Sequence, residues 1–172
     1  YFEVADVDYH IGVTTTDMEQ DRGRLHSAGG VSFITPQTAN PAEVFRDNVQ
    51  VGIDGWPWEK GLASGAHALS DDLAEGENAG FLRDDALLSV IFISDEEDAS
   101  PYGVNSYINY FLNLKNSARR DAFNASALVG IDPDTLEPAD CVQGTGTPPG
   151  GAAAAFRYHD VAIQTGGVVA SI

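Results

Sequence analysis

Two short polar segments in this sequence could bind a divalent cation. Residues 14–17 read Thr-Thr-Thr-Asp, and residues 94–98 read Ser-Asp-Glu-Glu-Asp. Carboxylate and hydroxyl oxygens are the ligands that hard cations such as Mg²⁺ and Ca²⁺ require. Four consecutive carboxylates cannot all point at one ion, so we expect one or two of them to bind. The alternative is a solvated acidic turn at a helix N-terminus, where negative charge is mildly favourable.

Each polar segment follows a stretch with the composition of a β-strand. Residues 8–16 are rich in β-branched and aromatic residues and have no helical period, which predicts a buried strand. Residues 87–93 (Leu-Leu-Ser-Val-Ile-Phe-Ile) form an almost continuous apolar run, typical of a parallel strand covered on both faces. Shorter strands are predicted at residues 31–35, 126–131 and 168–172.

Helices are predicted between these strands. Asn40 and Pro41 form a good helix start, and that helix should reach about residue 49. Further helices are expected at residues 59–69, 104–112 and 152–165, and residues 132–151 should form a long loop. The helix at 152–165 should turn Phe156 and Ile163 inward, and the helix at 104–112 should have one apolar stripe, formed by Val104, Tyr107, Ile108, Phe111 and Leu112. This alternation predicts an α/β fold with a doubly wound, mostly parallel sheet and helices on both faces. Ligands of such sheets bind beyond the carboxyl ends of the strands, where both polar segments should lie.

Charge and length restrict the partners. The 172 residues suffice for one domain and include 26 Asp and Glu against 9 Lys and Arg, a net charge of -17. Such a surface repels phosphate backbones and anionic lipid, so nucleic acid is not an expected partner. The sequence has no apolar run long enough for a membrane span, so direct membrane insertion is not expected either. Cys141 is the only cysteine, and it is either a free thiol or half of a disulfide with a residue outside this segment.

The order and spacing of four motifs resemble the bacterial, secreted branch of the von Willebrand factor A family. The motifs are DYHIGVTTTDM at residues 8–18, NVQVG at 48–52, EKGL at 59–62 and VIFISDEED at 90–98. The resemblance extends over nearly the whole chain, so residues 1–172 are expected to form a single, partial domain of this type. It implies an extracellular or cell-surface location, on the bacterial outer surface or in the periplasm.

The resemblance also implies a metal-ion-dependent adhesion site that holds Mg²⁺ or Ca²⁺. In the family, an Asp-x-Ser-x-Ser motif, a Thr from a loop and an Asp after the fourth strand share the ion. The last of these corresponds to Asp95; Glu59 or Asp54 would replace the missing Thr, and Asp98 is a further candidate ligand. Residues beside the ion would contact the bound partner, namely Thr15, Thr16, Asp17, Trp58 and Glu97. Trp58 could instead pack beneath its own loop.

This sequence departs from the family because Asp-x-Ser-x-Ser, and the first central strand that precedes it, are absent. A gap in the sheet would expose unpaired backbone groups on both flanking strands, so we expect upstream sequence or another chain to supply the strand. The family often continues beyond such an ending with a cysteine, which would provide a partner for Cys141 just after Ile172.

The expected function is therefore a non-enzymatic adhesion module that binds a protein or glycan ligand. One alternative is a structural subunit of a surface assembly without a functional metal site. Another is a Mg²⁺-dependent hydrolase in which residues 95–98 hold the ion. The hydrolase would need a base or nucleophile that the sequence does not reveal, and Gly-x-Ser-x-Gly is absent. The four histidines share no ligand spacing, so a zinc site is not expected.

Overall fold

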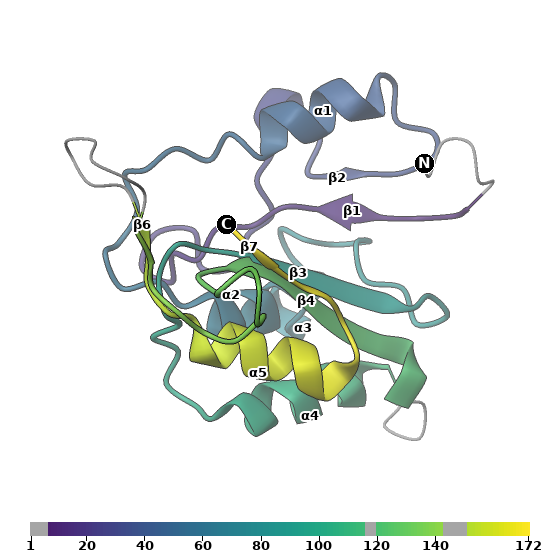
Figure 1. Cartoon of the computed structure of the whole chain (residues 1–172). Helices are drawn as coiled ribbons and strands as arrows, with labels where there is room; N and C mark the ends of the chain where they lie inside the picture. Colours follow the sequence, from purple (N-terminus) through teal and green to yellow (C-terminus); the bar gives the residue numbers. More distant parts are fainter. Residues whose placement is uncertain (1–6, 116–119, 143–150) are drawn as a thin grey trace. The chain divides into compact units, whose positions relative to one another are not determined.

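The computed structural model describes residues 7–115, 120–142 and 151–172 (Figure 1). The chain divides into two compact units. The first unit comprises Tyr1–Pro57 and Ala63–Ala86, and the second comprises Trp58–Leu62 and Leu87–Ile172. The boundary between the units falls inside helix α2 (Gly61–Ala68).

A three-stranded parallel sheet forms the centre of the second unit. Its strands are β3 (Leu88–Ile93), β4 (Phe123–Val129) and β7 (Val169–Ser171), in the order β3-β4-β7. Helix α4 (Val104–Leu114) and the short helix η2 (Arg120–Ala122) connect β3 to β4, and helix α5 (Phe156–Thr165) precedes β7. Consecutive parallel strands joined through helices confirm the α/β class and the parallel sheet that the sequence predicts.

One face of this sheet packs against α4 and α5. The ring of Phe123 on β4 stacks on Phe111 of α4 at 4.9 Å between centroids, and Phe92 on β3 lies 5.2 Å from the ring of Tyr158 on α5. The stripe of α4 predicted to be apolar is buried at Tyr107, Ile108, Phe111 and Leu112. These aromatic contacts form the core of the second unit.

On the opposite face of the sheet, two apolar side chains of β3 are exposed. The side chains of Ile91 and Ile93 on β3 are 66% and 60% exposed, although the sequence predicts a strand covered on both faces. Both α4 and α5 arise from crossovers in the same direction along the sheet, β3 to β4 and β4 to β7, so their right-handed connections place them on the same face. The doubly wound arrangement, with helices on both faces, therefore stays a prediction.

Helix α5 begins later and turns a different stripe inward than predicted. Phe156 and Ile163 are 61% and 56% exposed, while Tyr158, Val161 and Ala162 are buried. The prediction was wrong because α5 has two apolar stripes. The stripe that packs inward contains the small Ala162 and Tyr158, whose hydroxyl has a hydrogen-bond partner inside the unit. Ala152, predicted to begin this helix, instead lies in strand β6 (Gly151–Ala152).

A small antiparallel pair interrupts the predicted loop at residues 132–151. Strands β5 (Cys141–Val142) and β6 (Gly151–Ala152) pair with each other, and residues 143–150 of the loop lie outside the described part. The thiol of Cys141 is free in this structure, with Sγ 3.6 Å from Oγ of Ser171 beside the C-terminal strand. The pairing of Cys141 with a cysteine beyond Ile172 stays a prediction.

The first unit contains the antiparallel pair β1 (Ile11–Gly12) and β2 (Phe33–Ile34), the short helix η1 (Ala28–Gly30) and helices α1 (Pro41–Asn48) and α3 (Asp71–Ala74). The strand predicted at residues 8–16 is limited to two residues, because the following polar residues bond to the loop; Thr14 Oγ1 donates to Arg24 O at 3.0 Å. Helix α1 confirms the predicted start at Pro41, but Asn40 has a left-handed backbone and its side chain caps nothing.

Buried asparagines hold the irregular segments of the first unit together. The side-chain amide of Asn78 accepts from Leu25 N–H and donates to the carbonyls of Gly23 and Ala68, each at 2.9 Å. Asn48 similarly joins the end of α1 to Ala28 and Val31. Side-chain amides thus replace the sheet ladder that the sequence pattern predicted here.

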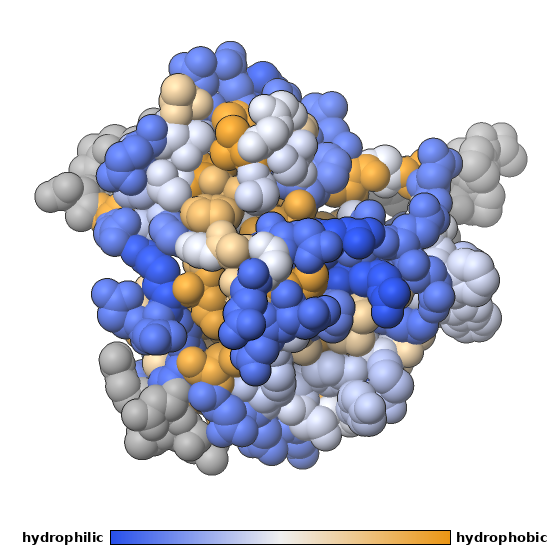
Figure 2. Space-filling model, turned by 180° about the vertical axis from the view of Figure 1, so that it is seen from behind, coloured by the Kyte–Doolittle hydropathy of each residue, from blue (hydrophilic) through white to orange (hydrophobic). Residues whose placement is uncertain are grey.

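The surface is mostly hydrophilic, with apolar atoms exposed in patches, as Figure 2 shows for one face. Within the described ranges, no helix combines the length and the apolar character that crossing a bilayer requires.

Candidate binding site

An acidic turn at residues 94–98 follows β3 at the carboxyl end of the sheet. Its first residue, Ser94, is buried and donates its backbone N–H to Leu128 O, which continues the pairing with β4. The Ser94 hydroxyl lies 2.5 Å from Oε2 of Glu59 and accepts the N–H of Glu96 at 3.0 Å. Ser94 therefore holds the turn in a tight loop and joins it to the segment that contains Glu59.

Asp98 is a buried, ion-paired carboxylate. Its Oδ2 lies 2.8 Å from Nε of Arg157, and its side chain is 0% exposed. Oδ1 accepts the hydroxyl of Ser100 at 2.7 Å and the backbone N–H of Leu62 at 3.1 Å. Each oxygen of this carboxylate already has protein partners, which gives Asp98 a structural role, and its role as a metal ligand stays a prediction.

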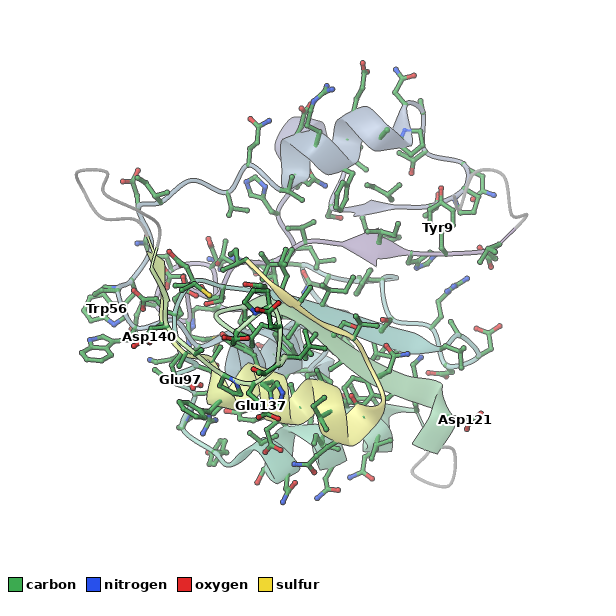
Figure 3. All side chains as sticks on the ribbon, viewed as in Figure 1. Tyr9, Trp56, Glu97, Asp121, Glu137 and Asp140 are labelled. Carbon is green, nitrogen blue, oxygen red and sulfur yellow. The ribbon has the colours of Figure 1, made fainter. Side chains whose placement is uncertain are left out.

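Glu97 caps the N-terminus of α5. Oε2 accepts the N–H of Phe156 at 2.5 Å, and Oε1 accepts the N–H of Arg157 at 3.1 Å, so the carboxylate satisfies two of the helix's free donors. Figure 3 shows Glu97 beside the start of this helix. The cap of α5 is therefore provided by a residue distant in the sequence and not by the residue that precedes the helix.

The hydroxyl of Tyr158 lies beneath the turn. It accepts the N–H of Gly61 at 3.1 Å, and a Cβ at Gly61 would collide with this hydroxyl, so glycine is required there. Burial raises the pKa of Tyr158 far above its ordinary value of 10.0, and the nearby charges of Asp98 and Glu59 raise it further. Tyr158 is therefore a neutral hydrogen-bonding group under physiological conditions.

Several hydrogen bonds fix the segment that carries Trp58. Besides the bonds from Gly61 and Leu62, the carbonyl of Glu59 accepts the N–H of Ala99 at 2.7 Å, and the Glu59 carboxylate contacts Ser94. Trp58 itself is 65% exposed. The indole is thus presented to solvent from a firmly held backbone.

An open pocket of about 510 Å³ lies over the acidic turn. It is lined by residues 95–99, Trp58, Gly151 and Ala153. Ala153 N–H donates to Asp95 O at 2.8 Å, which holds the β6 segment against the turn. Among the described residues, the exposed carboxylates of Asp95 and Glu96 have no hydrogen-bond or ion-pair partner, so they are the ones available to a ligand.

The predicted site residues divide between the two units. In the second unit, Asp95, Asp98, Glu97 and Trp58 line this pocket, and Glu59 is joined to it through Ser94. The other four, Thr15, Thr16, Asp17 and Asp54, belong to the first unit.

Asp17 has a structural role within the first unit. Oδ1 accepts the N–H groups of Glu19 and Gln20 at 2.6 and 3.0 Å, and Oδ2 accepts that of Trp56 at 3.1 Å. Thr15 Oγ1 donates to Asp21 at 2.7 Å, whereas the carboxylate of Asp54 is exposed. The Asp17 carboxylate and the Thr15 hydroxyl thus stabilise the loop after β1, a structural role that the sequence did not predict.

Few carboxylates in the described part of the second unit are left for a metal ion. The described residues contain no group of three or more His, Cys, Asp or Glu side chains arranged to hold an ion. Glu59, Glu97 and Asp98 are occupied by Ser94, by the start of α5 and by Arg157, respectively, which leaves Asp95 and Glu96. Two carboxylates can hold Mg²⁺ or Ca²⁺ only if water or a bound ligand completes the coordination of the ion.

Comparison with protein-family models, curated proteins and solved structures finds no match to this chain. The likeness to the von Willebrand factor A family therefore depends on the sequence motifs alone.

Sequence patterns missed the residues that hold the site together. Arg157, Tyr158 and Ser100 supply the partners of Asp98 and Gly61, and Arg157 lies 59 residues from Asp98 in the sequence. The one signal that the sequence offered was Arg157, a basic residue in the first turn of α5. Gly151 and Ala153 were assigned to a loop end and a helix, so their place in the pocket was also missed.

Proposed function

We propose that this protein is an extracellular or cell-surface binding module that recognises a protein or glycan ligand at the pocket beside Trp58 and Asp95. The observation that carries the proposal is the pairing of an exposed indole with unpartnered carboxylates in one open pocket. Large aromatic side chains on rigid backbone provide much of the binding energy at recognition surfaces. The hydrogen bonds of residues 59–62 supply that rigidity.

The chemistry of the pocket favours a ligand with an apolar face next to hydroxyl or cationic groups. A sugar ring can stack its C–H face on an indole while its hydroxyls donate to carboxylates, and a Lys or Arg side chain can do both through cation–π contact and an ion pair. A ligand with its own negative charge would be repelled by Asp95 and Glu96 and by the net charge of -17.

Binding is favoured over hydrolysis because the carboxylates near the pocket are mostly committed to the fold. Glu97 and Asp98 bond to α5 and Arg157, and Tyr158 stays protonated, so none of them is free to accept a proton from a substrate. We propose a non-enzymatic role on this basis.

The binding experiment compares three forms of the protein on an immobilised panel of neutral glycans, acidic glycans and basic peptides. Wild type should retain neutral glycans or basic peptides, and Trp58→Ala and Asp95→Asn should each weaken that binding by about tenfold, equivalent to about 1.4 kcal/mol. The control is Trp56→Ala, an exposed tryptophan of the first unit, which should bind as wild type does. Equal binding by wild type and Trp58→Ala would refute the proposed site.

The divalent ion is a separate part of the proposal, and Asp95 is its candidate ligand. Calcium or magnesium at millimolar concentration should raise the Tm of wild type but not of Asp95→Ala, since an ion that binds only the folded state stabilises it. Sodium chloride at equal ionic strength is the control. An equal rise of Tm in both proteins would show that Asp95 holds no ion.

A further inference from the structure

The pocket over the acidic turn is negatively charged. Of the residues that line it, four are acidic and none is basic. Arg157 lies outside this lining and is paired with Asp98, and the carboxylate of Glu97 is bonded to two N–H groups at the start of α5. Among the described residues, no opposite charge is paired with Asp95 or Glu96. These two carboxylates therefore set the charge that a ligand meets.

This charge distinguishes between the two classes of ligand that the pocket could accept. A ligand that covers a carboxylate removes part of its hydration, and a carboxylate is costly to cover when no opposite charge replaces the water. A neutral sugar offers hydroxyl donors but no charge, whereas a cationic group offers donors and the opposite charge together. The pocket therefore favours a cationic ligand over a neutral glycan.

Trp58 determines which cation fits best. Its indole lines the same pocket, is 65% exposed and is carried by a backbone that hydrogen bonds hold in place. The guanidinium group of arginine is planar and weakly hydrated, so it can stack on an aromatic face while its N–H groups bind a carboxylate in a bidentate manner. The ammonium group of lysine is a compact, strongly hydrated charge that cannot stack in this way. An indole next to carboxylates thus matches arginine better than lysine.

The charge of the whole chain favours an arginine that belongs to a polypeptide. With 26 acidic residues against 9 basic ones, the chain attracts basic polypeptides at long range and repels polyanions. The pocket is open to solvent, so a single side chain can enter it while the backbone that carries this side chain stays outside.

We propose that the pocket binds an arginine side chain of a basic segment of a partner protein, with the guanidinium group stacked on Trp58 and bonded to the carboxylate of Asp95. Glu96 adds to the negative charge at the same place. This inference rests on the proposed function and selects one of its two ligand classes, a polypeptide. Binding of a neutral glycan is an outcome of the test.

The test measures binding of the whole chain to three short peptides that differ at one kind of residue. Each peptide consists of Gly and Ser with two arginines, two lysines or two citrullines and carries a neutral fluorophore. Fluorescence anisotropy should show saturable binding of the arginine peptide, about threefold weaker binding of the lysine peptide and at least about tenfold weaker binding of the citrulline peptide. Citrulline has the shape of arginine without its charge, so equal binding of these two peptides would overturn the proposal. Equal binding of the lysine peptide would refute the stacked guanidinium.

Two substitutions separate the contribution of the ring from that of the charge. Trp58→Leu removes the aromatic face but keeps an apolar side chain, and Asp95→Asn removes the charge but keeps the size. Each should weaken binding of the arginine peptide by about tenfold. Circular dichroism checks that the variants are folded, and Trp58→Ala replaces Trp58→Leu if the latter is not.

Glu137→Gln is the matched control for the loss of one charge. Glu137 is exposed and belongs to the second unit, but it does not line the pocket. This variant has the same net charge as Asp95→Asn and should bind the arginine peptide as wild type does. If both variants lose affinity equally, the peptide responds only to the total charge of the chain, and the proposed contact with Asp95 is wrong.

The glycan panel distinguishes failure of this inference from failure of the proposed function. If neutral glycans bind wild type but not Trp58→Ala, and the arginine peptide does not bind at about 1 mM, this inference is overturned while the proposed binding site stands. If no glycan and no peptide binds, both are overturned.

Discussion

At the residue scale, adjacent carboxylates of the acidic turn have opposite roles. Asp98 is buried against Arg157, Ser100 and the start of α2, whereas Asp95 is exposed and unpartnered among the described residues. The sequence predicted that only one or two of the four acids could serve a ligand, and the structure identifies Asp95 and Glu96 as available. It could not predict which acids were committed, because their partners come from segments about sixty residues away.

Replacing each of these two aspartates by asparagine should separate their roles. Asp98→Asn removes the buried charge that pairs with Arg157, which keeps only the carbonyls of Ser100 and Tyr102, and should lower the free energy of unfolding by about 3 kcal/mol. Asp95→Asn removes an exposed charge and should change it by less than about 0.5 kcal/mol. Urea unfolding measures both. A small effect of Asp98→Asn would mean that the ion pair contributes little to folding.

Tyr158 should make stability depend on pH in the alkaline range. Its pKa in the folded protein is raised above 10.0, so the stabilisation is fully present below pH 10 and is lost as pH rises above that value toward the folded pKa. Thermal unfolding measured between pH 8 and pH 11 should show the Tm falling at the upper end.

Tyr158→Phe is the control for this effect. It should weaken the alkaline dependence and lower stability at pH 7 by about 1–3 kcal/mol, because the buried N–H of Gly61 loses its acceptor. An unchanged alkaline slope in Tyr158→Phe would assign the dependence to another group.

At the scale of the elements, apolar periodicity predicted which segments are helices and strands better than it predicted which side faces inward. α4 has one apolar stripe, and the prediction of its buried residues is confirmed. α5 has two, and the choice between them depended on the size of Ala162 and on the partner of the Tyr158 hydroxyl, which only tertiary contacts reveal. Strand β1 is shorter than predicted for a similar reason, since hydroxyl groups bond to the loop and end the pairing.

The N-terminus of α5 should depend on Glu97. Glu97→Ala leaves the N–H groups of Phe156 and Arg157 without their acceptor and should lower the free energy of unfolding by about 1 kcal/mol. Glu96→Ala, which removes the exposed neighbouring carboxylate, should have almost no effect. Chemical denaturation of the two variants provides the comparison, and equal effects would argue against the capping role.

At the scale of the whole molecule, 26 acidic residues against 9 basic ones should make folding sensitive to ionic strength. Salt screens the repulsion among exposed carboxylates, so the Tm should rise by several degrees between about 20 mM and 500 mM NaCl. Potassium chloride should act equally at the same ionic strength. A Tm that falls with salt would show that attractive ion pairs, such as Arg157 with Asp98, outweigh the repulsion.

The anchoring of residues 59–62 has a consequence for how the protein could change during evolution. The bonds that hold this segment come from backbone N–H groups and from Glu59, while the side chain of Trp58 contributes to none of them. Selection could therefore replace the tryptophan and shift ligand preference while the scaffold keeps its stability. Variation among relatives should be tolerated at position 58 and resisted at Gly61, Asp98 and Tyr158.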